Sequence, residues 1–327
     1  MRALRLQGPN EPRLHDEPDP SPAPGEVLVR VSAVGLCGSD RHWLLEGGIG
    51  DAQLEHPLVL GHEFAGVVAS GAREGERVAV DPAIPCGACD LCAAGLEHLC
   101  PAVRFAGHGS TDGALRTLLA WPERLVHPVP ETLTDVEAAL AEPLGVALHA
   151  FDLGHVRPGA GAGVFGCGPL GLLLVQLLNM AGASPIVATD LLAHRVAAAA
   201  ELGATHAVLA GGVALDQDLE VAFEVAGDDG AIDEAVASLR PGGRLVLVGI
   251  PDDDRTSFRA SAARRKGLTL LLSRRMRAAD LPRALLLAAE GRVDLKGLVS
   301  ARYALDEWPD AFAALRERRG LKVVIEP

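Results

Sequence analysis

The chain has 327 residues, which is long enough for two domains that each bury a core of their own. Its 43 acidic and 30 basic residues give a formal net charge of −13, so a nucleic-acid partner is not expected. Apolar residues make up 49% of the chain and aromatic residues only 3%, a composition typical of an α/β protein with a buried sheet.

The first part of the chain is predicted to be rich in β-strands. Residues 25–34 alternate between apolar and polar side chains and then become apolar, as a strand that enters a core does. Residues 1–7 contain no signal-peptide core, and the longest apolar run, 170–178, is too short to cross a membrane. We therefore expect a cytoplasmic protein whose six cysteines are metal ligands or free thiols rather than disulfides.

Reactive side chains gather after this strand, at Cys37, Ser39, Asp40, His42, His62 and Glu63. A thiolate, an imidazole and a carboxylate are common ligands of a catalytic zinc ion, which keeps one coordination position open. A buried thiol and a turn with a solvated acid would explain the same residues without a metal. The spacing alone leaves both interpretations open.

A second group of potential ligands is more specific. Four cysteines lie within 15 residues, at Cys86, Cys89, Cys92 and Cys100. Four thiolates close a tetrahedral shell around zinc and leave no position for a substrate. Disulfides or a redox function fit this spacing less well in a reducing compartment. The sequence therefore predicts a structural zinc site that does no chemistry.

A helix is predicted over 138–150, with Thr134 as its N-cap and Glu137 three residues later. Pro143 is expected to break or kink this helix beside Glu142. Glu142 is either a surface charge or a second acid near a metal, and the helix pattern does not decide between them.

Three glycines have the spacing of a dinucleotide-binding turn. The apolar pair Val164 and Phe165 leads into Gly166, Gly168 and Gly171, and a leucine-rich helix follows. The first glycine permits a tight turn, the second lets a pyrophosphate approach, and the third lets the helix pack against the strand. The amino end of that helix offers N–H groups to the phosphates.

The next strand, 185–190, ends at Asp190. A carboxylate there accepts hydrogen bonds from the ribose hydroxyls and repels a 2′-phosphate, so it favours NAD over NADP. Arg195 lies nearby and is able to meet a phosphate, which keeps NADP as the alternative. The predicted cofactor-binding residues are Gly166, Gly168, Pro169, Leu170, Gly171, Asp190, Arg195, Gly249 and Ile250.

Strands and helices alternate from about 155 to 275, which predicts a doubly wound parallel sheet. Ligands of such sheets lie beyond the carboxyl ends of the strands, where Gly249 and Ile250 are expected, although an ordinary βα turn explains these two residues equally well. Two further helices are predicted to begin at Asp280 and Asp306, and a last strand covers 321–325.

The motif Gly61-His62-Glu63, the four-cysteine segment and the three glycines occur together and in this order. With them the chain resembles the zinc-dependent medium-chain alcohol dehydrogenases over essentially its whole length. The resemblance implies a GroES-like, β-rich catalytic domain over 1–150 and a Rossmann NAD-binding domain over 151–278. It also implies that a C-terminal part, 279–327, returns to the catalytic domain, and that the protein is a homodimer or homotetramer.

Within that family, Cys37, His62 and Glu63 match the catalytic-zinc motif, and the four clustered cysteines match the structural-zinc site. Ser39 and His42 match the residues of a proton relay. Glu142 resembles the sorbitol (L-iditol) dehydrogenase branch, which implies a polyol, diol or amino-polyol rather than ethanol as substrate. The resemblance leaves open whether Glu63 or Glu142 touches the metal directly or through water.

The implied function is hydride transfer from a secondary alcohol to NAD. Three alternatives are a threonine-type or other alcohol dehydrogenase that uses NADP, a zinc-independent quinone-type reductase, and a non-catalytic NADH-sensing protein. A short-chain dehydrogenase is excluded, because it needs a tyrosine with a lysine four residues later, and the only tyrosine, Tyr303, is followed there by Glu307.

Overall fold

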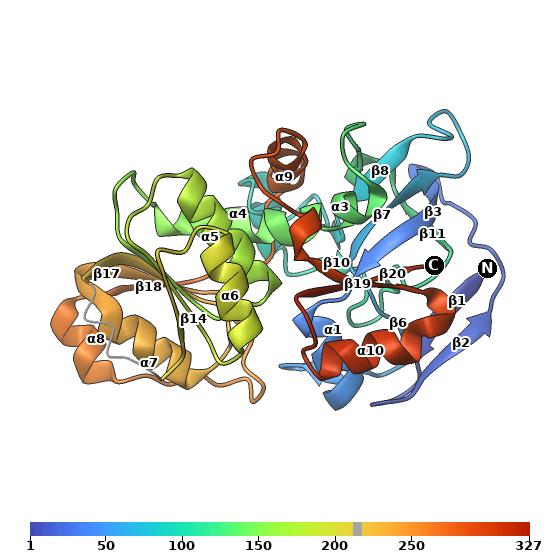
Figure 1. Ribbon diagram of the computed structural model, residues 1–327. Coiled ribbons are helices and arrows are strands. Elements are labelled where there is room, and N and C mark those ends of the chain that lie inside the picture. Colours follow the sequence, from blue (N-terminus) through green and yellow to red (C-terminus); the bar gives the residue numbers. More distant parts are fainter. Residues whose placement is uncertain (212–217) are drawn as a thin grey trace. The chain divides into compact units, whose positions relative to one another are not determined.

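A computed structural model describes residues 1–211 and 218–327 (Figure 1). The chain divides into two compact units. The first contains Met1–Pro143 and Arg277–Pro327, and the second contains Leu144–Met276. The chain therefore leaves the first unit once and returns to it for its last fifty residues or so.

A mainly antiparallel sheet of seven strands organises the first unit. Its central strand is β3 (Glu26–Gly35), which pairs with β7 (Glu63–Val68), β11 (Leu118–Pro122) and β20 (Lys322–Glu326). Its other strands are β8 (Arg77–Val80), β12 (Val126–Pro128) and β19 (Val299–Ala304). Since β20 pairs with β3, residues 322–326 lie in the same sheet as residues 26–35.

Shorter elements surround this sheet. The short strands are β1 (Arg2–Leu6), β2 (Pro12–Asp16), β4 (Gly48–Ile49), β5 (Ala52–Gln53), β6 (Leu58–Val59), β9 (Ala83–Ile84) and β10 (Arg104–Phe105). The helices are α1 (Gly38–Glu46), α2 (Asp90–Ala93), α3 (Asp135–Ala139), α9 (Asp280–Ala289) and α10 (Trp308–Arg316). Four 3₁₀ turns are η1 (Glu97–Leu99), η2 (Glu123–Leu125), η3 (Lys296–Leu298) and η4 (Leu305–Glu307). The core between them buries Trp43, Phe64 and Trp121.

The helix expected over 138–150 is two helices. Thr134 caps α3 as predicted: its Oγ1 accepts a hydrogen bond from Glu137 N at 3.2 Å, and the Glu137 carboxylate accepts one from Thr134 N at 2.8 Å. The predicted break at Pro143 is wrong, because α3 ends at Ala139 with Leu140 as its C-cap, and Pro143 lies in the first turn of α4 (Ala141–Gly154). Proline is tolerated there, since N–H groups of the first turn have no partner within the helix.

The second unit is the predicted doubly wound sheet. Six parallel strands run in the order β15-β14-β13-β16-β17-β18. They are β13 (Ala162–Phe165), β14 (Ile186–Asp190), β15 (His206–Leu209), β16 (Leu219–Glu224), β17 (Leu239–Leu247) and β18 (Thr269–Leu272). The order reverses direction between β13 and β16, which is where such sheets bind their ligands.

Four helices connect these strands: α5 (Pro169–Met180), α6 (Ala193–Glu201), α7 (Asp229–Ser238) and α8 (Ala260–Lys266). Because βαβ crossovers are right-handed, α5 and α6 cover one face of the sheet and α7 and α8 the other. The sequence pattern did not predict α8, whose Ala- and Arg-rich turns bury only Ala263 and so carry no apolar periodicity.

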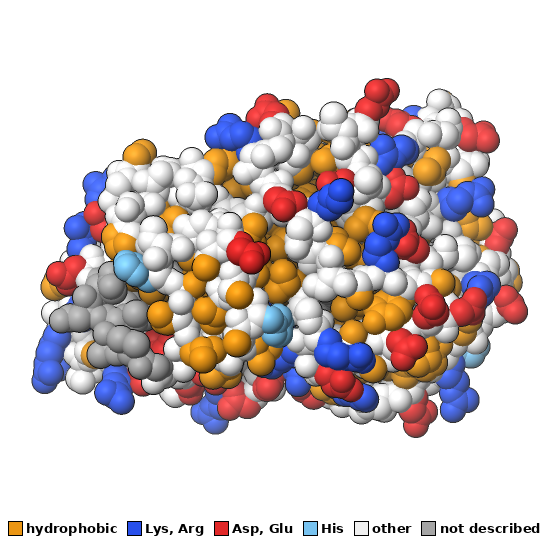
Figure 2. All heavy atoms as spheres, in the orientation of Figure 1, with side chains coloured by type: hydrophobic (Ala, Val, Ile, Leu, Met, Phe, Trp, Pro, Cys, Tyr) orange, Lys and Arg blue, Asp and Glu red, His pale blue; other side chains and the backbone are white. Residues whose placement is uncertain are grey.

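Among the described residues, acidic and basic side chains are interspersed on the face that Figure 2 shows. Among the described residues, no helix combines the length and the apolar character that a membrane span requires.

Candidate metal centres and cofactor site

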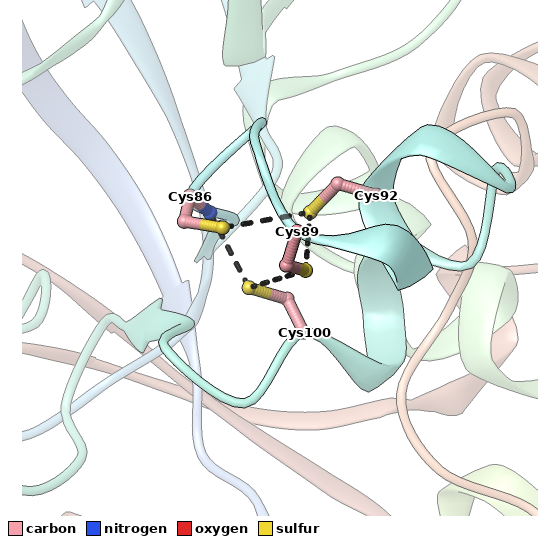
Figure 3. A group of neighbouring side chains, drawn as sticks. All are labelled: Cys86, Cys89, Cys92 and Cys100. Carbon is pink, nitrogen blue, oxygen red and sulfur yellow. Dashed lines mark hydrogen bonds between the residues drawn. The ribbon is translucent and has the colours of Figure 1, made fainter.

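The four clustered cysteines converge on one point (Figure 3). The Sγ atoms of Cys86 and Cys92 are 3.9 Å apart, those of Cys89 and Cys92 are 3.5 Å apart, and those of Cys89 and Cys100 are 4.0 Å apart. Zinc–sulfur bonds of about 2.3 Å in a tetrahedron place the sulfur atoms about 3.8 Å from one another. The four thiols therefore fit a closed zinc shell.

The electrostatics of this cluster also favour a cation. Backbone N–H groups of Ala88 and Cys89 lower the pKa of Cys86 to about 6, whereas desolvation and a hydrogen bond with Cys89 raise the pKa of Cys92 to about 12. One thiolate therefore forms readily, and further thiolates beside it are disfavoured. A divalent cation removes that conflict, because all four thiolates then share its charge.

A second group of ligand atoms lies at the carboxyl end of β3. Cys37 is the N-cap residue of α1, directly after β3, and Glu63 is the first residue of β7. The two strands are paired so that Gly35 stands opposite Glu63, which carries His62 toward Cys37. One ligand atom each of Cys37, His62 and Glu63 lies within 4.8 Å of the others. A soft sulfur, an imidazole and a carboxylate at this spacing fit a three-ligand zinc site.

Asp40 orients this group, although the sequence analysis did not include it among the site residues. Its carboxylate is completely buried and accepts hydrogen bonds from Cys37 N at 2.9 Å and from Gly61 N at 3.2 Å. It also lies 3.6 Å from His62 Nδ1. Burial opposes its ionisation, but His62 and the two N–H groups outweigh burial and lower its pKa. A carboxylate behind Nδ1 leaves Nε2 of His62 for a metal.

The predicted relay residues lie on the first turns of α1. Ser39 Oγ is 3.4 Å from His62 Nε2, the nitrogen that Asp40 leaves available. His42, one helical turn later, is buried, and its Nδ1 lies 3.5 Å from a carboxylate oxygen of Glu46. Since Glu46 is 43% exposed, the order Ser39, His42 and Glu46 along α1 leads from the metal ligands toward solvent.

Two further ionisable side chains are buried near Glu63. Glu142, in the first turn of α4, is not part of the group of three mutually close ligand atoms. Burial and the charge of Glu63 raise the pKa of Glu142 to about 8, against the opposing effect of His62. Lys322 is the other residue. Burial disfavours its charge, but Glu63 and Cys37 outweigh burial and raise its pKa, so it is an ammonium ion. The sequence analysis did not select Lys322, which is the first residue of β20 and is followed there by three apolar residues.

The glycine-rich turn lies in the second unit, between β13 and α5. Gly166 has a φ of 106°, and a side chain there would come within 2.7 Å of Ala226 N. A side chain at Gly171 would lie 1.9 Å from Gly166 O, so this glycine allows α5 to begin against the turn. Gly168 differs, because its nearest neighbour would be Arg195 Nη1 at 3.6 Å. The space beside Gly168 is therefore free for a ligand at the amino end of α5.

Asp190 is fixed at the end of β14. One carboxylate oxygen accepts a hydrogen bond from Cys167 N at 2.8 Å and the other accepts one from Leu192 N at 2.9 Å. Arg195 Nη1 lies 3.8 Å from this carboxylate. Asp190 thus remains an acceptor in a fixed position beside the turn.

The carboxyl ends of β16 and β17 complete this edge of the sheet. Glu224 is 1% exposed and accepts hydrogen bonds from Ala226 N at 2.7 Å and Gly227 N at 2.6 Å. A side chain at Gly249 would lie 2.1 Å from Gly227 N, so the two loops are in backbone contact. Ile250 is 47% exposed beside them.

Comparison with known proteins agrees with both sites. Residues 23–131 match the family "Alcohol dehydrogenase GroES-like domain", and residues 169–290 match "Zinc-binding dehydrogenase". A sorbitol dehydrogenase of Bacillus subtilis is 34% identical over 344 residues, covering 100% of this chain and 97% of that protein. The chain belongs to the zinc-binding alcohol dehydrogenases. The GroES-like and Rossmann folds implied by the sequence are confirmed, as is the resemblance to the sorbitol dehydrogenase branch.

Solved structures show the nicotinamide cofactors of such dehydrogenases. A protein of Escherichia coli CFT073, described as a short chain alcohol dehydrogenase complexed with NADH, has a TM-score of 0.92 and 26% identity, covering 100% of this chain and 99% of that one. A zinc-binding dehydrogenase of Sinorhizobium meliloti bound to NADP has a TM-score of 0.90 and 30% identity, with the same coverage. From its family and its relatives, the chain described here is an oxidoreductase that acts on CH–OH groups.

Proposed function

We propose that this dehydrogenase oxidises a secondary alcohol of a polyol, diol or amino-polyol and transfers the hydride to NAD, with one catalytic and one structural zinc ion per chain. The convergence of Cys37, His62 and Glu63 carries the proposal, because it supplies three ligands and so leaves a fourth position for the substrate oxygen. The full-length similarity to a sorbitol dehydrogenase supports the substrate class.

The residues of the first unit have distinct roles in this proposal. Cys37, His62 and Glu63 would hold the catalytic zinc, and Asp40 keeps the imidazole oriented. Zinc supplies a Lewis acid that makes an alcohol hydroxyl acidic near neutral pH. Glu142 is a buried acid next to this group, and such a residue suits a substrate that carries further hydroxyl groups.

Ser39 and His42 would move the hydroxyl proton. Ser39 Oγ lies 3.4 Å from His62 Nε2, so it is within reach of an oxygen held beside that nitrogen. His42 lies one helical turn later on α1, and an imidazole exchanges protons readily near neutral pH. The Glu46 carboxylate, 3.5 Å from His42 Nδ1, passes the proton to solvent.

The second unit would bind NAD. The free space beside Gly168 suits the pyrophosphate at the amino end of α5, and Asp190 is positioned as the acceptor for a ribose hydroxyl. Negative charge at Asp190 disfavours a 2′-phosphate, whereas Arg195 would favour one. We infer a preference for NAD because the carboxylate is held by two backbone N–H groups.

We further infer a homodimer or homotetramer in the cytoplasm. The edge strand β18 supports self-association, because Leu272 at its end is 80% exposed. Light scattering on the purified protein measures the mass directly. None of the six cysteines forms a disulfide, which suits a reducing compartment.

The test is NAD reduction, followed by absorbance, against a panel of polyols, diols, amino-polyols and hydroxy amino acids, with NADP in parallel. The Cys37→Ser variant should lose turnover and keep its affinity for NADH, since Cys37 and the glycine turn belong to different units. NADH binding without turnover on any alcohol would favour a sensor. Turnover with about one zinc per chain would favour a quinone-type reductase.

A further inference from the structure

The ammonium group of Lys322 is enclosed by the metal-ligand group. The side chain is 2% exposed, and its Nζ lies 2.7 Å from Glu63 Oε1, 2.6 Å from Glu63 Oε2 and 3.1 Å from Leu36 O. An ammonium ion has three donors, and these three acceptors use all of them. Both oxygens of Glu63 are therefore engaged by one cation from the last strand of the chain.

Gly35 makes room for this arrangement. It stands opposite Glu63 in the β3–β7 pair, and a side chain at position 35 would lie 2.2 Å from Glu63 Oε2. The carboxylate thus occupies the volume that a side chain on β3 would need. Glu63 is drawn toward Lys322 on one side and is accommodated there by the absence of a Cβ at Gly35.

The ion pair is not needed to attach the last strand. The backbone already does this, since Leu36 N donates to Val323 O at 2.9 Å and β20 pairs with β3 through Val324 and Ile325. A buried ion pair is poor evidence for stability, because a well-packed apolar pair in its place is often neutral or stabilising. The position of Lys322 on a metal ligand instead indicates a role at the metal site.

We propose that Lys322 is a positioning residue that restrains Glu63 as a zinc ligand. Lys322 competes with the metal for the Glu63 carboxylate, so Cys37 and His62 bind the ion firmly while Glu63 stays weakly engaged and leaves room for substrate. This inference rests on the proposed catalytic zinc site. Without Lys322, the Glu63 carboxylate loses this ion pair and should bind the metal fully.

The test is the rate at which zinc leaves the protein for a chromophoric chelator, which does not depend on turnover. Two phases are expected, and the one missing in Cys37→Ala belongs to the catalytic site. Lys322→Met should slow that phase on the order of tenfold, the size of effect that neighbours of metal ligands have. A merely structural lysine predicts the opposite, because a loosened site releases zinc faster.

A matched control is Arg302→Met, which breaks the exposed Arg302–Glu326 pair between β19 and β20, at 2.6 Å, and should leave zinc release unchanged. In a Glu63→Gln background, Lys322→Met should no longer slow the release, because its effect acts through that carboxylate. If Lys322→Met does not fold, Gly35→Ala tests the same idea by pushing the carboxylate away from Lys322, and it should also slow the release.

Three outcomes would overturn the proposal. The first is zinc release from folded Lys322→Met, or from Gly35→Ala if Lys322→Met does not fold, that is as fast as or faster than from the wild type. The second is an equal effect of Lys322→Met in the wild-type and the Glu63→Gln backgrounds, and the third is an effect of Arg302→Met as large as that of Lys322→Met. If the Cys37-dependent phase is absent from the wild type, the catalytic zinc site itself is wrong. The two failures are therefore distinguishable.

Discussion

Gly168→Ala should separate cofactor binding from folding. Gly168 is the N-cap residue of α5, with φ −64° and ψ −179°, which alanine adopts without strain. The added Cβ would meet no protein atom closer than Arg195 Nη1 at 3.6 Å. The free energy of unfolding should therefore fall by less than about 1 kcal/mol, the usual cost of alanine at an N-cap.

NADH binding should suffer much more, because the new methyl group stands where the pyrophosphate must approach the backbone. Losing one hydrogen bond between an N–H group and a charged phosphate costs roughly 1.5–3 kcal/mol. At about 1.4 kcal/mol per factor of ten, the Kd for NADH should rise about 10- to 150-fold. The assay is fluorescence titration with NADH, together with thermal melting of the unliganded protein.

Two comparisons control this experiment. Gly171→Ala places its Cβ 1.9 Å from Gly166 O, so α5 must move, and both the melting temperature and NADH affinity should fall. Gly8→Ala, in the first unit, meets nothing within 4 Å and should change neither. If Gly168→Ala keeps the wild-type melting temperature and binds NADH within about threefold of wild type, the glycine turn does not hold the pyrophosphate.

Three other outcomes are expected. Cys89→Ser should release the structural zinc and lower the melting temperature while NADH titration is unchanged; a protein that keeps two zinc ions would contradict the closed shell. Asp190→Ser should raise kcat/KM for NADP relative to NAD by tenfold or so, since a carboxylate no longer repels the phosphate; an unchanged ratio refutes the assigned role. Arg5 binds the Glu17 carboxylate at 2.9 Å and lowers its pKa, so Glu17→Gln should destabilise at neutral pH by about 0.5–1 kcal/mol. That difference should persist above the unfolded pKa of about 4.3 and vanish as pH falls through the lower folded pKa, which chemical denaturation at several pH values measures.

The sequence predicted best those features whose determinants are local. The four cysteines lie within one short loop, and the Gly166–Gly171 turn lies within one strand–helix junction, so spacing alone indicated each of them. The capping box of Thr134 and Glu137 was found for the same reason. The position of the helix break was not predicted, because leucine at position 140 is not a helix-breaking residue and Pro143 is tolerated in the first turn of α4.

The spacing of Cys37, His62 and Glu63 did not by itself indicate a metal site, because strand pairing brings these residues together. Nothing in the sequence states that Gly35 stands opposite Glu63, and the spacing of Cys37 and His62 therefore left a metal-free interpretation open. Asp40 was visible in the motif, but its hydrogen bond to Gly61 N joins two loops that are remote in sequence. Lys322 lies 259 residues after Glu63, so only the paired strands reveal the contact.

The two proposed zinc ions thus depend on the fold in different ways. The structural shell closes within the segment from Cys86 to Cys100, so its metal affinity is a property of that loop, and four thiolates make release slow. The catalytic group takes its ligands from the ends of β3 and β7 and its buried cation from β20, so it exists only when this sheet is complete. A site that must exchange water for substrate needs a weakly held ligand, and the fold provides one by opposing the zinc with Lys322 rather than by removing Glu63. It follows that a perturbation of β20 should act on the catalytic metal before it acts on the structural one.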